Sequence, residues 1–129
     1  MPVSALVVDD SMLIRHTVCR FLEERGFSVD SASNGEEALE YVSRRIPGII
    51  ITDMHMPRMT GSQLITALKT KPETAEIPVI ILAGKSSGFD ADEKRAAFVI
   101  FKDIDVETQL GMALDSVLGD HAMKKTASC

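Results

Sequence analysis

Residues 48–57 read GIIITDMHMP, and this stretch decides the fold. Three isoleucines and a threonine form a short apolar, β-favouring run, which is typical of a strand covered on both faces. The run ends at one carboxylate, Asp53, and the loop after it closes with Pro57. Such a strand indicates a parallel sheet between layers of helices, and the carboxylate at its end is either a helix cap or a chemical group.

Apolar runs of the same kind recur along the chain, and we expect each to form a strand. They are ALVV at 5–8, FSVDSA at 27–32, PVIIL at 78–82 and FVIF at 98–101. The stretches between most of these runs carry apolar residues at helical spacing. The alternation of strand and helix predicts an α/β fold with right-handed crossovers. We expect a doubly wound, five-stranded parallel sheet in the flavodoxin-like order 2-1-3-4-5, with helices on both faces.

Length and composition fit one globular domain. The chain has 129 residues, 45% of them hydrophobic and 26% charged, which suffices for one core and is too few for two. We expect the domain to span residues 1–119 and residues 120–129, DHAMKKTASC, to form a flexible tail.

Charge and hydropathy exclude two classes of partner. The formal charge of −5 argues against a surface for nucleic acid, which needs clustered Lys and Arg. No apolar run approaches the ~20 residues that span a bilayer, so we expect no membrane insertion. The N-terminal residues lack the pattern of a signal peptide, and Cys19 and Cys129 fit free thiols. We therefore expect a cytoplasmic protein.

Charged side chains close three of the expected strands. The first strand ends in Asp9 and Asp10, the third in Asp53 and the fifth in Lys102. In an open α/β sheet, ligands bind beyond the carboxyl ends of the strands, where the strand order reverses. Strands one and three are neighbours at that reversal, so the three carboxylates are expected to converge. A helix cap explains Asp10 or Asp53 singly but does not explain the whole set.

Converging carboxylates need a compensating charge. Two unit charges about 4 Å apart repel by roughly 4 kcal/mol at an effective dielectric constant of about 20. Either a carboxylate takes up a proton or a cation binds between them. Mg²⁺ suits a site with few oxygen ligands, because it keeps several waters and readily adds a phosphate oxygen. Lys102 can reach the same place as a point charge for that phosphate.

These residues resemble the receiver domain of the response regulator family. The resemblance covers residues 3 to about 119. It is carried by VVDDS at 7–11, DMHMPRMTG at 53–61, IPVIIL at 77–82 and Lys102. The resemblance implies a single-domain protein with the chemotaxis-regulator fold, whose strand order is the one expected above.

By this resemblance, Asp53 is the phospho-acceptor. Asp9 and Asp10 hold Mg²⁺ (or Mn²⁺) together with Asp53. The backbone carbonyl of His55 completes the protein ligands, and Lys102 pairs with the phosphoryl group. A carboxylate is a competent nucleophile for this transfer and gives an aspartyl phosphate. The implied function is that of a two-component receiver, not an enzyme, which accepts phosphate from a histidine kinase or phosphotransfer protein and signals to a downstream protein target.

The sequence departs from the family where the phosphorylation signal is usually transmitted. The fourth strand usually ends in Thr or Ser, and here that position is Ala83. The usual aromatic residue three positions before the lysine is Val99, and the usual proline after the lysine is Asp103. We expect a trans Lys102–Asp103 bond, with Asp103 capping the last helix. The departures predict that the domain accepts phosphate but switches weakly.

Two other functions remain open at this stage. A phosphate-independent interaction domain could keep the same acids by descent. A Mg²⁺-dependent phosphatase with an aspartyl nucleophile usually has a second acid two residues after it, and here that position is His55. Hydrolysis of added phosphomonoesters would separate the phosphatase from the receiver.

Overall fold

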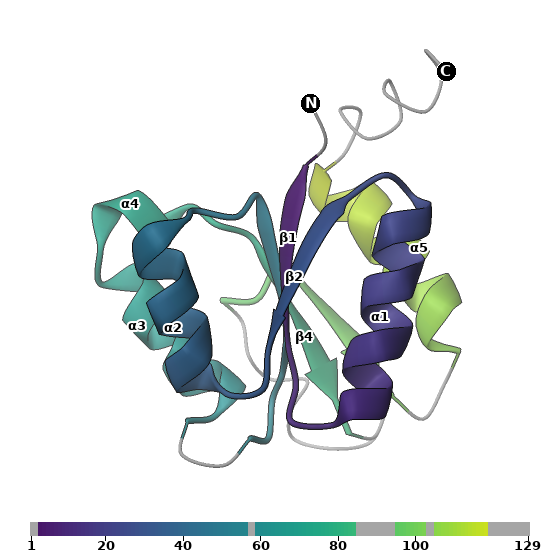
Figure 1. Ribbon diagram of the computed structural model, residues 1–129, viewed down its shortest axis with the longest axis horizontal. Coiled ribbons are helices and arrows are strands. Elements are labelled where there is room, and N and C mark those ends of the chain that lie inside the picture. The colour runs from purple at the N-terminus through teal and green to yellow at the C-terminus, as the bar shows by residue number, and fades with distance from the viewer. Residues whose placement is uncertain (1–2, 57–58, 85–94, 103–104, 119–129) are drawn as a thin grey trace.

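The computed structural model describes residues 3–56, 59–84, 95–102 and 105–118, which form a parallel sheet between helices (Figure 1). The strands are β1 (Ser4–Val8), β2 (Ser28–Ala32), β3 (Ile49–Asp53), β4 (Val79–Ala83) and β5 (Phe98–Phe101). The helices are α1 (Met12–Glu24), α2 (Gly35–Arg44), α3 (Gly61–Lys69), α4 (Pro72–Ala75) and α5 (Val106–Leu118). The strand order is β2-β1-β3-β4-β5 with every neighbouring pair parallel, so the expected fold is confirmed.

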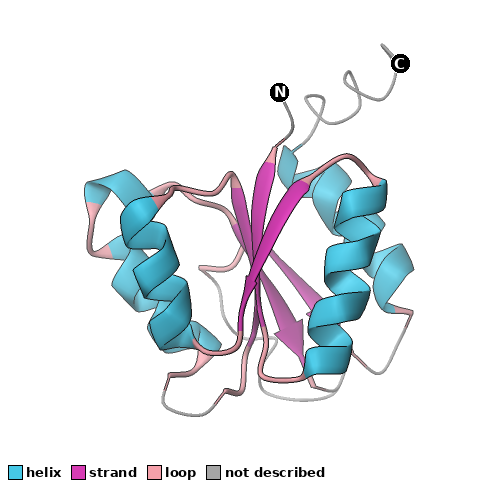
Figure 2. Ribbon diagram, viewed as in Figure 1, coloured by secondary structure: helices cyan, strands magenta, loops and turns pink. Residues whose placement is uncertain are grey.

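The helices form one layer on each face of the sheet. Helices α1 and α5 cover one face, and α2, α3 and α4 cover the other (Figure 2). Because successive side chains of a strand point to opposite faces, each strand contributes to both cores. In β1, Ala5 and Val7 pack with α1 and α5, whereas Leu6 and Val8 pack with α2 and α3. The sheet is therefore doubly wound.

The central strands are buried on both faces, as the run at residues 48–57 indicated. Every residue of β3 and of β4 is buried. Fully burying one isoleucine side chain is worth roughly 1.5–3 kcal/mol, so the three consecutive isoleucines of β3 contribute strongly to the stability of the sheet. A rigid, central strand thus ends at Asp53.

Local side chains begin and end the helices that flank the carboxyl edge. Ser11 caps α1 by accepting a hydrogen bond from the Ile14 N–H, and Asn34 caps α2 in the same way. Thr60 and Gln63 form a reciprocal capping box at the start of α3. These caps determine how each helix leaves the loop after its strand.

Two boundaries differ from those expected. Helix α4 is a short helix that begins at Pro72, and the apolar spacing of the sequence did not indicate it. At the start of α5, the Asp105 carboxylate accepts a hydrogen bond from the Thr108 N–H at 3.3 Å, so Asp105 occupies the capping position we had assigned to Asp103. Asp103, its bond to Lys102, and the expected tail at 120–129 lie outside the described residues. No helix in the described ranges is long and apolar enough to cross a membrane.

Candidate functional site

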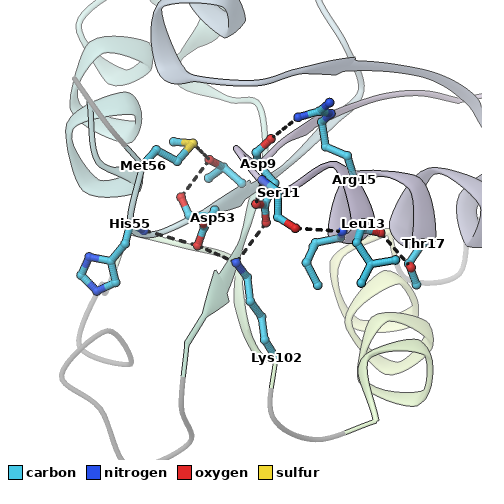
Figure 3. A network of polar contacts seen from close by, with 11 residues as sticks. Asp9, Ser11, Leu13, Arg15, Thr17, Asp53, His55, Met56 and Lys102 are labelled. Carbon is cyan, nitrogen blue, oxygen red and sulfur yellow. Dashed lines mark hydrogen bonds and ion pairs between the residues drawn. The ribbon is translucent and has the colours of Figure 1, made fainter.

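Four charged side chains lie close together at the carboxyl edge of the sheet, those of Asp9, Asp10, Asp53 and Lys102. Figure 3 shows three of them, Asp9, Asp53 and Lys102. In the register of β1 and β3, Val8 lies opposite Thr52, so the next residue of each strand emerges beside the other. Carboxylate oxygens of Asp9, Asp10 and Asp53 all lie within 4.8 Å of one another. The structure therefore brings together the acids that the strand ends predicted, although their roles stay predictions.

Asp9 is held by the turn between β1 and α1. Its Oδ1 accepts a hydrogen bond from the Ser11 N–H at 2.8 Å, and its backbone carbonyl accepts one from the Arg15 guanidinium at 2.8 Å. The residue is completely buried, whereas the neighbouring Asp10 is exposed. The sequence did not indicate these contacts of Ser11 and Arg15, because a hydrogen bond in which one partner is a backbone group leaves no pattern in the sequence.

Lys102 bridges the two buried carboxylates. Its Nζ lies 3.0 Å from Asp53 Oδ1 and 3.1 Å from Asp9 Oδ2. The Asp9 Oδ2 atom is buried and accepts no hydrogen bond of good geometry within the described residues. Its negative charge is compensated by the ammonium group of Lys102. A buried charge without such compensation is strongly destabilising, so this oxygen depends on a nearby cation.

Burial and charge shift two pKa values in the site. Burial raises the pKa of Asp53 above its usual value, the charge of Asp9 raises it further, and the hydrogen bond and charge of Lys102 oppose both. Burial alone would lower the pKa of Lys102, but its contacts with Asp53 and Asp9 raise it overall. The site therefore favours a charged lysine and disfavours a charged Asp53. Three carboxylates and one ammonium group leave it short of positive charge.

Asp53→Asn is expected to stabilise the metal-free protein in a pH-dependent way. A carboxyl group whose folded-state pKa is raised stabilises the fold at low pH, and that stability is lost as the pH rises through the folded-state pKa. Asparagine does not titrate, so the stability gained by the variant should be largest near neutral pH and shrink toward the usual carboxyl value of 3.8. Urea unfolding of both proteins in EDTA measures this difference. A stability gain of Asp53→Asn that grows as the pH falls would contradict a raised pKa of Asp53.

The loop after Asp53 is closed by a backbone contact at the start of α3. The Gly61 N–H donates a hydrogen bond to the Met54 carbonyl at 2.7 Å. A Cβ atom at Gly61 would lie 2.7 Å from the Asp53 carbonyl oxygen and 3.0 Å from the Met54 Cα. Only glycine allows this approach, so Gly61 determines where the acceptor loop meets α3.

Gly61→Ala is expected to destabilise the protein by about 1–3 kcal/mol and to displace the acceptor loop, because the atoms that the new methyl group would meet belong to the backbone. Gly84→Ala is the matched control, since a Cβ atom at that glycine meets nothing within 4 Å. Urea unfolding measures both variants. Equal stability of the two variants would show that the contact at Gly61 is not tight.

The remaining predicted residues lie around this cluster. The His55 N–H donates a hydrogen bond to Asp53 Oδ1 at 3.3 Å, while its imidazole points away from the cluster (Figure 3). Ala83 is fully buried at the end of β4, and its carbonyl accepts a hydrogen bond from the Lys102 N–H at 2.8 Å. Val99 is half-buried opposite Ile81. The metal role of the His55 carbonyl and the altered switch at Ala83 and Val99 stay predictions.

Curated relatives of this chain are response regulators or contain a similar segment. One is response regulator Rre1 of Synechocystis, 36% identical over 85 residues, which make up 65% of this chain and 37% of that protein. Another is the gliding motility regulatory protein of Myxococcus xanthus, 37% identical over 114 residues, which make up 85% of this chain and 14% of that protein. The matched region is thus well under two thirds of either relative.

Solved structures that resemble this chain include a chemotaxis response regulator and a receiver domain. The chemotaxis response regulator CheY4 of Vibrio cholerae gives a TM-score of 0.81 at 28% identity, over 91% of this chain and 100% of that one. The receiver domain of a signal transduction histidine kinase from Syntrophus aciditrophicus gives 0.80 at 30% identity, over 91% of each chain. The family model of the response regulator receiver domain matches residues 5–115. The chain therefore belongs to the response regulator receiver domain family.

Proposed function

We propose that this domain accepts a phosphoryl group on Asp53, in a Mg²⁺-dependent phosphorelay that starts from a histidine kinase or phosphotransfer protein. The observation that best supports the proposal is the position of Lys102, whose Nζ lies within 3.1 Å of both buried carboxylates. Receiver domains of this family interact with such phosphodonor proteins. The proposed downstream target is a protein, and the proposed location is the cytoplasm.

The proposed reaction makes one bond and breaks one bond. A carboxylate oxygen of Asp53 attacks the phosphorus atom of a phosphohistidine, the P–N bond breaks, and the imidazole leaves with the electron pair. The product is an acyl phosphate on Asp53. Phosphoryl transfer needs positioning and charge stabilisation more than covalent chemistry. Lys102 supplies both, since its ammonium group already contacts the acceptor carboxylate and can move to a phosphoryl oxygen.

The donor atoms fit the metal that the family uses. Receiver domains bind Mg²⁺ at an acidic pocket, and Asp9, Asp10 and Asp53 offer only oxygen ligands, which hard cations such as Mg²⁺ and Mn²⁺ prefer. The buried Asp9 Oδ2, which accepts no hydrogen bond in the described part of the chain, supports the same assignment. These residues would hold the ion together with the His55 carbonyl. When bound, the ion would neutralise charge on the phosphoryl oxygens.

Incubation with a small phosphodonor, with and without Mg²⁺, tests the proposal. Intact mass should rise by one phosphoryl group only when Mg²⁺ is present, and added phosphomonoesters should not be hydrolysed. Turnover of those esters would instead identify a phosphatase. No gain in mass under any metal condition would favour the phosphate-independent interaction domain and would sink the proposal.

The switch that follows phosphorylation is expected to be weak. Ala83 has no hydroxyl to donate to a phosphoryl group, and Val99 is short and stiff at χ1. A hydrogen bond to a charged group is worth about 1.5–3 kcal/mol, so its loss removes roughly 10–150-fold of bias between two conformations.

Amide NMR spectra recorded with Mg²⁺ alone and with Mg²⁺ plus a phosphoryl mimic measure this switch. Shifts should be confined near Asp10, Asp53 and Lys102. Large shifts spreading over residues 85–110 would refute the weak switch. An Ala83→Thr variant, which restores a hydroxyl at the end of β4, is the matched comparison and should show the wider response.

A further inference from the structure

We propose that Gln109 is a positioning residue for Lys102. The Gln109 side chain forms two hydrogen bonds with the backbone of Phe101, the residue directly before the lysine. We call this pair of hydrogen bonds the amide clamp. Its effect on phosphoryl transfer rests on the function proposed above, whereas its effect on the lysine can be measured without any transfer.

The amide clamp joins the first turns of α5 to the end of β5. The Phe101 N–H donates to Gln109 Oε1 at 3.0 Å, and Gln109 Nε2 donates to the Phe101 carbonyl at 2.8 Å. The same Nε2 also donates to the Asp105 carbonyl at 3.2 Å. Asp105 in turn caps α5 through Thr108. The side-chain amide of Gln109 is therefore hydrogen-bonded both to the start of α5 and to the end of β5.

The clamp acts on the side of β5 that has no neighbouring strand. Strand β5 lies at the edge of the sheet, next to β4 alone. Along a strand in a parallel sheet, successive residues direct their polar backbone groups to opposite sides. The Lys102 N–H points to β4 and donates to the Ala83 carbonyl at 2.8 Å. The Phe101 N–H and carbonyl thus face the open edge, where the Gln109 amide takes the place of a further strand. The backbone leading into Lys102 is held from both sides.

A restraint on the backbone matters for Lys102, because its Nζ must lie close to two carboxylates at once. Its flexible four-carbon stem must bring Nζ to 3.0 Å from Asp53 and 3.1 Å from Asp9 (Figure 3). A proline after the lysine would restrict the lysine backbone, but the following residue in this chain is Asp103. The amide clamp supplies a restraint from the preceding residue instead.

Protection of an edge strand is the simpler reading of the same hydrogen bonds. Unpaired N–H and C=O groups on an edge strand invite pairing with other chains, and proteins commonly cover them. If Gln109 did only this, its replacement would lower stability without changing what Lys102 contacts. The two readings therefore differ in their effect on the lysine amine.

Competitive acetylation of the metal-free protein distinguishes these readings. Wild type, Gln109→Leu and Thr108→Ala are treated with a trace of acetic anhydride, and peptide mass spectrometry compares Lys102 with the exposed Lys69. Thr108→Ala is the control, because it weakens the cap of α5 and leaves Phe101 untouched. The labelling of Lys102 relative to Lys69 should rise several-fold in Gln109→Leu alone. No rise in Gln109→Leu, or an equal rise in both variants, would overturn the proposal.

Gln109→Glu provides a second variant if the leucine protein does not fold. Glutamate keeps the acceptor for the Phe101 N–H but replaces the donor to the Phe101 carbonyl with an oxygen. Labelling of Lys102 should again rise relative to Lys69. Unchanged labelling in a folded Gln109→Glu protein would overturn the proposal just as well.

A double-mutant cycle then tests the consequence for phosphoryl transfer. Loss of positioning in the Gln109→Leu protein should slow phosphorylation by a small phosphodonor roughly 10- to 100-fold. The same replacement should change little in a Lys102→Met background, because the residue it acts through is gone. An equal slowing in both backgrounds would contradict the positioning role. A wild-type protein that gains no phosphoryl group would count against the proposed function, and the acetylation result would still decide the role of Gln109.

Discussion

Asp53→Asn is expected to abolish the gain of a phosphoryl group, whatever the concentration of phosphodonor or Mg²⁺. Asparagine keeps the size and burial of the side chain at the end of β3 but removes the nucleophilic carboxylate. Since the metal-free variant is also expected to be more stable than the wild type at neutral pH, unfolding would not explain the loss. Intact mass after incubation with Mg²⁺ and a small phosphodonor measures the effect.

Asp10→Asn is the matched comparison for this prediction. Asp10 is an exposed member of the carboxylate cluster, so its replacement should chiefly weaken Mg²⁺ binding. Raising the Mg²⁺ concentration should restore phosphorylation of Asp10→Asn and leave Asp53→Asn unreactive. Phosphorylation of Asp53→Asn at the wild-type rate would show that Asp53 is not the phospho-acceptor.

Lys102→Met is expected to change two properties in opposite directions. Loss of the ammonium group removes a charge that stabilises the transferring phosphoryl group, an effect of the kind worth roughly 10²–10³-fold in rate. The same loss removes a positive charge that lies 3.0 Å from Asp53 and 3.1 Å from Asp9, and that competes with a divalent cation for both carboxylates. Mg²⁺ should therefore bind more tightly to the variant while phosphorylation becomes slower.

The control for this variant is Lys69→Met, which removes an exposed lysine far from the carboxylate cluster in the sequence. The Lys69 Nζ donates a hydrogen bond to the Ala75 carbonyl. It should leave both properties close to those of the wild type. Calorimetric titration with Mg²⁺ and the rate of mass gain provide the two measurements. If Lys102→Met bound Mg²⁺ more weakly, the lysine would support the metal site instead of competing with it.

The sequence was sufficient to predict the sheet and the charged residues at its edge. Continuous apolar runs such as that ending at Asp53 are a strong signal, because a strand buried on both faces tolerates few polar residues. Convergence of Asp9 and Asp53 followed from the strand order alone, since neighbouring parallel strands end at the same edge. These features depend on patterns that persist over several residues.

The missed features depend on single side chains that contact the backbone. Gln109 donates a hydrogen bond to the Phe101 carbonyl, and Arg15 donates one to the Asp9 carbonyl. Neither contact has a periodic signature in the sequence. The cap of α5 was misplaced, because two aspartates precede the helix and only geometry shows which carboxylate reaches the Thr108 N–H. Helix α4 was missed because proline both ends one helix and can begin the next.

Reductive trapping of the phosphorylated protein tests the central claim most directly. Borohydride converts an aspartyl phosphate to homoserine, and peptide mass spectrometry then identifies the residue that carried the phosphoryl group. After incubation with Mg²⁺ and a small phosphodonor, the proposed function predicts homoserine at position 53 and none when Mg²⁺ is withheld. Homoserine at position 9 or 10, or trapping that does not depend on Mg²⁺, would contradict it.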